Sequence, residues 1–125
     1  MILPLRFLAT LALLLTAFAS PALAAEPYEG RWADDPAWCK NTRQSNTDEL
    51  PIVISRKSIE TFASFCRVLS TTRKGAAWWL HTSCRDEGQT ETEPRAQITF
   101  VLRVDGNRLY LRDDTGVQNL HRCPR

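Results

Sequence analysis

The chain has few of the groups on which common enzyme chemistry depends. It contains only two histidines, His81 and His121, and none of the motifs G-x-S-x-G, H-E-x-x-H or C-x-x-C. Serine hydrolase, zinc protease and dithiol redox sites are therefore not indicated. The adjacent acids at 34–35 and 113–114 are typical of solvated turns rather than of two carboxyls that converge across a cleft. We predict a protein that is not an enzyme, with no catalytic residues, no cofactor and no metal site.

The sequence also lacks a bias toward charge of one sign. Its 16 Lys and Arg are balanced by 14 Asp and Glu, and the two signs are interspersed. A nucleic-acid-binding domain usually carries a basic patch or stripe, and none is apparent here. We predict that the partner is another protein or a cell-wall component, and not a nucleic acid.

Only one long hydrophobic run is present, and it lies at the N-terminus. Arg6 precedes an apolar segment at 7–18, and Ala-Leu-Ala at 22–24 is a small-x-small cleavage site. This pattern predicts a signal peptide over 1–24. The run is short for a bilayer span, no second run follows, and no cysteine directly follows the cleavage site. We expect no membrane anchor after cleavage, and export to the bacterial periplasm or secretion.

Residues 25–125 are expected to form a single all-β domain. Ala96–Val104 alternates apolar and polar side chains, as a half-buried strand does, and Asp105-Gly106-Asn107 predicts a hairpin turn. Asp35 is placed to cap one helical turn. Seven to eight short strands predict a small antiparallel β-barrel or sandwich, braced by two disulfides. The expected strands are 28–33, 50–55, 58–62, 65–71, 77–84, 96–104, 108–112 and 117–123.

The alternation of side chains also predicts which residues face the interior. These residues are bulky for a domain of this size, so we expect a filled core and no large pocket. They are Ile52, Ile54, Val68, Trp78, Leu80, Ile98, Phe100, Leu102, Leu109, Leu111 and Val117.

Four cysteines allow three pairings, and hairpin geometry favours one of them. If a hairpin turns at Gly75, Cys66 lies directly opposite Cys84, at a spacing that suits a disulfide. Cys39 and Cys123 then form a second bridge that encloses most of the domain. In an exported protein with no C-x-x-C motif, structural disulfides are favoured over a redox pair or a zinc site.

The aromatic residues offer the best lead to a binding surface. Trp78 and Trp79 are adjacent on an expected strand, so they point to opposite faces of it. If Trp78 points inward, Trp79 lies outside with Arg and His neighbours, a composition typical of interface hot spots and sugar-stacking platforms. The alternative is that the 85–94 loop or Trp38 covers Trp79. The candidate binding residues are Trp79, His81, Arg73 and Trp38.

Gly30-x-Trp32 on the first expected strand resembles the G-x-W motif that opens lipocalins and other calycin-like barrels. The chain is also similar in size to small periplasmic inhibitors of proteases and lysozymes. The resemblance implies that Trp32 closes one end of a barrel and that Arg112 or Arg122 packs over it.

A rigid, disulfide-braced β scaffold suits binding better than catalysis, because it holds a surface in place at low entropic cost. We therefore expect a small exported binding protein, specifically an inhibitor of an envelope-acting hydrolase such as a lysozyme or protease. The expected contact elements are the 34–49 loop, the Lys74-Gly75 hairpin and the 85–94 loop. The alternative is a calycin-like carrier of a small apolar ligand, which requires an open barrel mouth and a cavity of a few hundred Å³.

Overall fold

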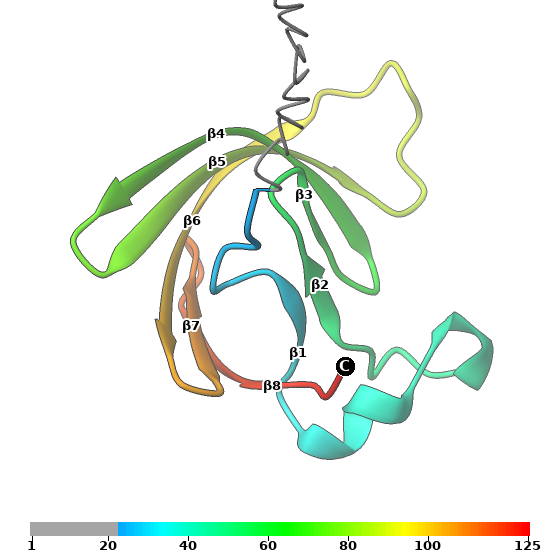
Figure 1. Cartoon of the computed structure of the whole chain (residues 1–125). Helices are drawn as coiled ribbons and strands as arrows, with labels where there is room; N and C mark the ends of the chain where they lie inside the picture. The colour runs from blue at the N-terminus through cyan, green and yellow to red at the C-terminus, as the bar shows by residue number, and fades with distance from the viewer. Residues whose placement is uncertain (1–22) are drawn as a thin grey trace, which may run out of the picture.

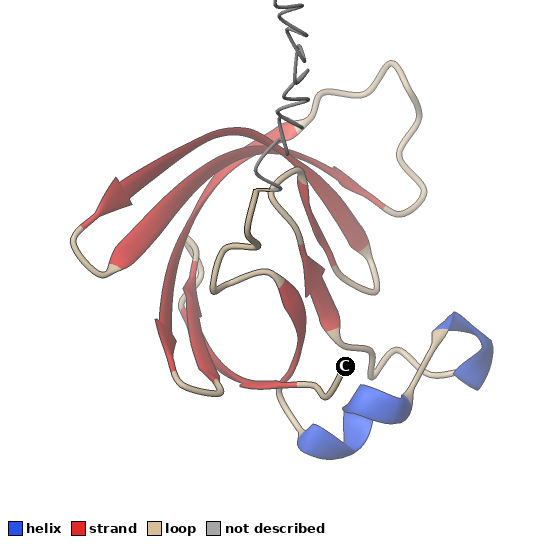
Figure 2. Ribbon diagram, viewed as in Figure 1, coloured by secondary structure: helices blue, strands red, loops and turns tan. Residues whose placement is uncertain are grey.

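The computed structural model describes residues 23–125, so nearly all of the expected signal peptide lies outside the described residues. Eight strands form a closed antiparallel barrel in sequence order, with β8 pairing back to β1 (Figures 1 and 2). The expected all-β fold is confirmed, as a barrel rather than a sandwich. The strands are β1 (Gly30–Ala33), β2 (Ile52–Ile54), β3 (Ser58–Glu60), β4 (Ser64–Lys74), β5 (Ala77–Asp86), β6 (Ala96–Asp105), β7 (Arg108–Arg112) and β8 (Val117–Arg122).

Two short 3₁₀ helices form an arm outside the barrel, between β1 and β2 (Figure 2). They are η1 (Pro36–Lys40) and η2 (Arg43–Ser45). Asp35 caps η1 as expected, because its Oδ1 accepts a hydrogen bond from the Ala37 N–H at 2.8 Å. Within residues 23–125, no helix is long and apolar enough to cross a membrane.

Both predicted disulfides are confirmed. Cys66 on β4 pairs with Cys84 directly across on β5. The second bridge joins Cys39 in η1 to Cys123, immediately after β8. One bridge therefore lies within the barrel wall, and the other holds the helical arm against the last strand.

The β4–β5 hairpin contains a bulge that the alternation of side chains does not predict. The pairing between the strands shifts by one position at Leu69. A single inserted residue reverses the faces of all side chains beyond it. Arg73 therefore pairs with Trp78 and shares its face, which corrects the expectation that Arg73 lies beside Trp79.

The interior prediction holds for ten of the eleven residues, which belong to the core or pack against it. Val117 is the exception, since its side chain is 62% exposed. It pairs with the exposed Arg112, and paired residues share a face of the sheet. The core also includes Tyr28, Ile59 and Leu120, which the strand pattern did not predict.

The N-terminal segment closes one end of the barrel (Figure 1). Trp32 is fully buried there, and its indole Nε1 donates a hydrogen bond to the Tyr28 carbonyl oxygen at 2.8 Å. The Tyr28 ring packs edge-on against Trp78, with 5.4 Å between ring centroids. Burial and the nearby carboxylates Glu26 and Glu29 raise the pKa of the Tyr28 hydroxyl, so it stays protonated.

Arg122 covers Trp32, so the structure decides between the two arginines that the sequence left open. Its guanidinium lies 4.1 Å from the centroid of the Trp32 ring. It also donates hydrogen bonds to the carbonyl oxygens of Pro27 at 2.6 Å and Glu29 at 3.2 Å. Arg112 lies elsewhere, on the outer surface.

This stacking also explains the glycine of the G-x-W sequence. Gly30 has a φ of +138°, which L side chains rarely adopt, and a Cβ there would lie 3.3 Å from Arg122 Nη1. The glycine therefore permits both the turn into β1 and the close approach of the guanidinium.

Candidate functional site

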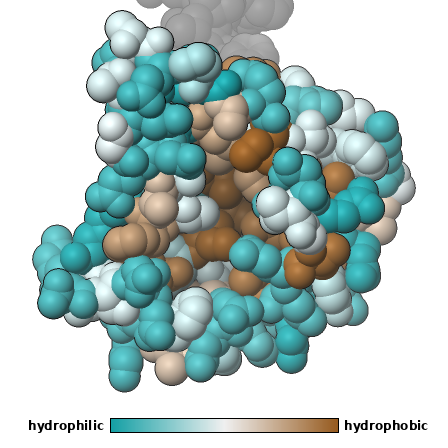
Figure 3. Space-filling view, turned by 180° about the vertical axis from the view of Figure 1, so that it is seen from behind, coloured by the Kyte–Doolittle hydropathy of each residue, from teal (hydrophilic) through white to brown (hydrophobic). Residues whose placement is uncertain are grey.

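The opposite end of the barrel is hollow. A cavity of about 400 Å³ enters the interior there. The space-filling view from this side shows a central hollow with a hydrophobic floor inside a largely hydrophilic surround (Figure 3). The expectation of a filled core with no large pocket is therefore wrong.

The cavity lies beside the part of β6 that extends past β7. β6 contains 10 residues and β7 only five, and the two strands pair only from Val101 onward. Ile98 and Phe100, on the part of β6 beyond β7, line the cavity. Ile59 on β3 and Cys66, which is paired with it on β4, also contribute to the lining.

The floor and walls of the cavity are hydrophobic. Its deepest residues belong to the buried core of the barrel, so the cavity is continuous with the interior rather than a dent in the surface. An apolar ligand entering it would remove its own surface and that of the floor from water. The apolar lining comprises Trp32, Leu50, Ile52, Ile59, Ala63, the Cys66–Cys84 disulfide, Ile98, Phe100, Leu111 and Leu120.

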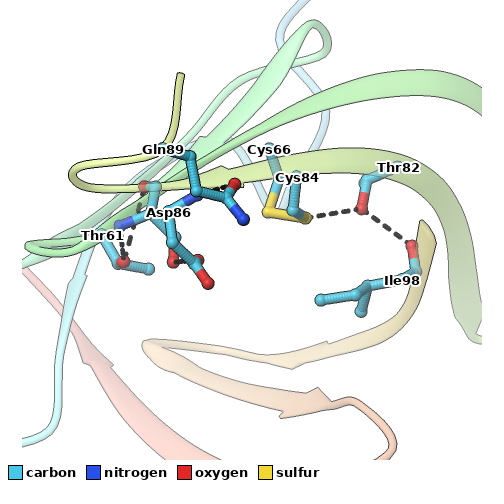
Figure 4. Close-up of a disulfide and its surroundings, with 8 residues drawn as sticks. Thr61, Cys66, Thr82, Cys84, Asp86, Gln89 and Ile98 are labelled. Atoms are coloured by element: carbon cyan, nitrogen blue, oxygen red, sulfur yellow. Dashed lines mark hydrogen bonds between the residues drawn. A yellow bond between two sulfur atoms is a disulfide. The ribbon is translucent and has the colours of Figure 1, made fainter. Parts of the chain in front are cut away.

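One hydrogen-bond chain fixes the cavity wall beside the disulfide (Figure 4). Thr82 is buried, and its Oγ1 donates to the Ile98 carbonyl oxygen at 2.8 Å and lies 3.3 Å from Cys84 Sγ. Close by, Ser64 Oγ donates to Asp86 Oδ1 at 2.6 Å. The wall formed by β4, β5 and β6 is thus cross-linked by a covalent bond and by polar contacts.

The rim of the cavity carries two aromatic side chains. Phe62, in the turn between β3 and β4, is 42% exposed. Trp38 comes from η1, whose position is fixed by the Asp35 cap and by the Cys39–Cys123 disulfide. An exposed phenylalanine beside an apolar hollow extends the surface available to a ligand.

The remaining rim residues are polar, and three of them are acidic. Asp34 follows β1, Asp48 precedes β2, and Asp113 lies between β7 and β8, so the three come from separate parts of the chain. Thr61, Ser64 and Gln118 are the neutral polar residues. No lysine, arginine or histidine is among the described residues that line the cavity.

Asp113 is held in its charged form. Burial alone would raise the pKa of its carboxyl, but Oδ1 accepts hydrogen bonds from the hydroxyl and N–H of Thr115, at 2.6 and 2.8 Å, and from the Gly116 N–H at 3.1 Å. These bonds outweigh burial and lower the pKa below its usual value. The rim therefore carries a fixed negative charge at neutral pH.

The structure separates the four candidate binding residues into three places. Trp79 and His81 lie on the outer face of β5, with Trp79 half-buried and His81 exposed. Arg73 lies at the closed end, with its guanidinium 4.9 Å from the centroid of the Trp78 ring. Trp38 alone lines the cavity.

Cationic side chains, rather than the 85–94 loop or Trp38, lie over Trp79. Lys74 Nζ is 4.2 Å from the indole centroid, and the Arg112 guanidinium is 5.9 Å away. On the same outer surface, Arg103 lies 4.2 Å from the Tyr110 ring. The outer face of β5–β7 thus presents aromatic rings beneath positive charges.

A second depression, of about 390 Å³, lies outside the barrel between the helical arm and strands β1–β3. Its lining includes Arg31, Lys40 and Arg43, and the last of these pairs with Glu60 at 3.3 Å. It lacks the buried apolar floor of the barrel cavity.

Strand periodicity could not reveal the barrel cavity, because the position of the cavity depends on how far neighbouring strands extend past one another. The acids at 34 and 113 could be interpreted only as turn residues, and nothing in the sequence joined them to Asp48 or Phe62.

Comparison with protein-family profiles, with curated proteins and with solved structures finds no match for this chain. Its class is thus given by its own geometry: a small disulfide-braced barrel, closed at one end and open to an apolar cavity at the other.

Proposed function

We propose that this protein binds a small apolar molecule in the open end of its barrel. The observation that carries the proposal is the cavity of about 400 Å³ with a floor of core side chains. Ligand sites are typically concave, mostly apolar and already formed before binding, with volumes of about 300–1,000 Å³. The two disulfides and the hydrogen-bonded wall hold this shape without a ligand, which lowers the entropic cost of binding.

The same proposal includes export and a likeness to the calycin-type barrels. The signal-like N-terminus and the two disulfides support an oxidising location, the periplasm or the cell exterior. The stacked Trp32 and Arg122 beside Gly30 support the likeness. In that setting the protein would carry or sequester its ligand outside the cytoplasm.

Titration with a fluorescent apolar probe tests the proposal. The oxidised domain, residues 25–125, is mixed with N-phenyl-1-naphthylamine, whose emission rises when it leaves water. We expect saturable binding to one site per molecule. Native mass spectrometry of the freshly purified protein additionally tests for a co-purified small molecule.

Two substitutions on one strand provide a matched comparison. Ile98 lines the cavity, whereas Val101 on the same strand faces outward beside Trp79. Ile98→Trp fills the cavity and should abolish probe binding, and Val101→Trp should leave it intact. Failure of the wild-type protein to bind the probe, or equal binding by both variants, would contradict the proposal.

A second candidate is the inhibition of an envelope-acting hydrolase through the outer face of β5–β7. It is supported by the cations that surround Trp79 and Tyr110, because Arg and Trp are enriched in interface hot spots. Purified lysozymes and proteases can be assayed with the oxidised protein. Stoichiometric inhibition that is lost in Trp79→Ala but kept in Ile98→Trp would favour this candidate over ligand binding.

A further inference from the structure

We infer that the ligand of the barrel cavity is a small organic cation, with an apolar body and an ammonium group at the cavity mouth. This inference rests on the proposed function and adds the chemical class of the ligand. It is carried by the distribution of charge around the apolar cavity.

The lining of the cavity differs in charge from the rest of the molecule. The whole chain has a formal net charge of +2, with 16 basic residues. Yet the charged groups on the described lining are three carboxylates, those of Asp34, Asp48 and Asp113, and none is basic. The lining therefore carries three formal negative charges on a chain whose formal net charge is positive.

These carboxylates form no ion pairs with described side chains, although Arg43 lines an adjoining depression with Asp48 and Phe62. Among residues 23–125, no Lys, Arg or His lies within ion-pair distance of any of the three. Asp34 and Asp48 are exposed. The hydrogen bonds to Asp113 come from a hydroxyl and backbone N–H groups, which leave its charge in place. All three carboxylates are thus available to attract a positive group on a ligand.

The arrangement suits an organic cation better than a metal ion. The described residues contain no group of three or more His, Cys, Asp or Glu side chains close enough together to hold a metal. The acids are instead distributed around an aromatic and aliphatic hollow, with Trp38 and Phe62 at the same rim. Aromatic faces attract ammonium groups, and apolar walls accept the hydrocarbon part of the same molecule.

The carboxylates also lie at the rim, where a ligand ammonium group loses the least hydration on binding. A ligand ammonium at the rim keeps part of its hydration, whereas one at the floor would be buried among core side chains with no counter-ion. The expected orientation is therefore apolar end inward, toward Ile59 and Leu120, and cationic end outward.

Three probes with the same ring system test the inference. They are 1-naphthylmethylamine, 1-naphthalenemethanol and 1-naphthoate, which are cationic, neutral and anionic at pH 7. Binding to the oxidised domain is measured by calorimetry at low and at high salt. We expect the amine to bind on the order of tenfold more tightly than the alcohol, and the carboxylate more weakly than either. The advantage of the amine should shrink as salt screens the rim.

A double variant and a matched control locate the effect. Asp34→Asn with Asp48→Asn removes two rim charges and leaves the Asp113 turn intact. It should reduce the amine's affinity toward that of the alcohol, whose own affinity should not change. Asp105→Asn removes a carboxylate from the β6–β7 turn, which is not part of the cavity lining, and should leave the preference unchanged.

The outcomes separate the two claims. If the alcohol binds as tightly as the amine, or the preference survives in the double variant, the charge inference fails while ligand binding stands. If none of the three probes binds, and N-phenyl-1-naphthylamine also fails, the proposed function fails and the inference fails with it.

Discussion

Replacement of Arg122 by alanine should destabilise the barrel, whereas the same change at Arg112 should not. Arg122 stacks on the buried Trp32 and bonds two carbonyl oxygens of the segment that closes the barrel. Arg112 is exposed, and its guanidinium lies 5.9 Å from the Trp79 centroid. The two substitutions remove the same side chain from neighbouring strands, so they form a matched pair.

The size of the effect follows from the contacts that Arg122 makes. A partly desolvated cation–π contact contributes about 1–2 kcal/mol. Each of its two hydrogen bonds is charge-assisted but partly exposed, and contributes about 1 kcal/mol. Their sum predicts a loss of about 3 kcal/mol in the free energy of unfolding for Arg122→Ala, against less than about 1 kcal/mol for Arg112→Ala.

Urea unfolding, followed by tryptophan fluorescence at pH 7, measures both losses. Arg122→Lys keeps the charge but lacks the planar fork that stacks and reaches two carbonyls, so it should recover less than half of the loss. The midpoints should move while the slope of the unfolding transition stays constant. Equal losses for the two alanine variants, or full recovery with lysine, would refute the role given to Arg122.

Three further predictions concern stability. Cys39→Ser with Cys123→Ser removes the bridge between η1 and the end of β8, and should lower the free energy of unfolding in denaturant by about 4–5 kcal/mol. Removal of the β4–β5 bridge should lower it by about 3 kcal/mol, because that bridge closes a loop of 18 residues rather than 84. The pKa of Asp113 is lowered by folding, so its contribution to stability should be complete above about pH 4 and lost as the pH falls through the folded-state pKa. Unfolding curves of the wild type and Asp113→Asn should therefore differ at pH 7 and converge near pH 2. In thermal unfolding, Trp79→Ala should lower the free energy of unfolding by about 1–2 kcal/mol, whereas Trp78→Ala, at a buried position, should lower it by about 3–5 kcal/mol. Equal losses would remove Trp79 as a candidate binding residue.

The barrel could be predicted from local patterns because each strand pairs with its neighbour in sequence. In such a meander, turn signals and alternation are sufficient to set the order of the strands, and the pairing of Cys66 with Cys84 follows from one hairpin. Alternation fails where the register shifts. The extra residue Leu69 moves Arg73 to the other face, and no turn signal marks it. Such a bulge bends the strand and increases its twist, which the alternation of side chains does not predict.

The site could be predicted only in part, because its residues meet through the closure of the barrel. The sequence predicts Trp38 as a binding candidate, but offers only Trp79 as its neighbour. Its actual neighbours at the rim, Phe62 and the three acids, come from loops at one end of the barrel that lie far apart in the sequence. The bulk of the inward residues predicts a filled core, because side-chain volume alone does not show where one strand extends past its neighbour. Here the cavity lies beside the part of β6 that extends past β7.

The positions of the two disulfides connect stability to the proposed site. Cys66–Cys84 forms part of the cavity wall, and Cys39–Cys123 holds the helical arm that brings Trp38 to the rim. At the closed end Trp32, Tyr28 and Arg122 pack together. The Cys39–Cys123 bridge is anchored beside them, because Cys123 directly follows Arg122 and its N–H donates to the Arg31 carbonyl oxygen. A hollow end lacks such packing, since the contacts that would stabilise its walls are missing. The Cys66–Cys84 bridge is thus a covalent cross-link in the wall where such contacts are missing. Together with the bridge that holds the arm of Trp38, it keeps the cavity and its rim in place, as a preformed binding site requires.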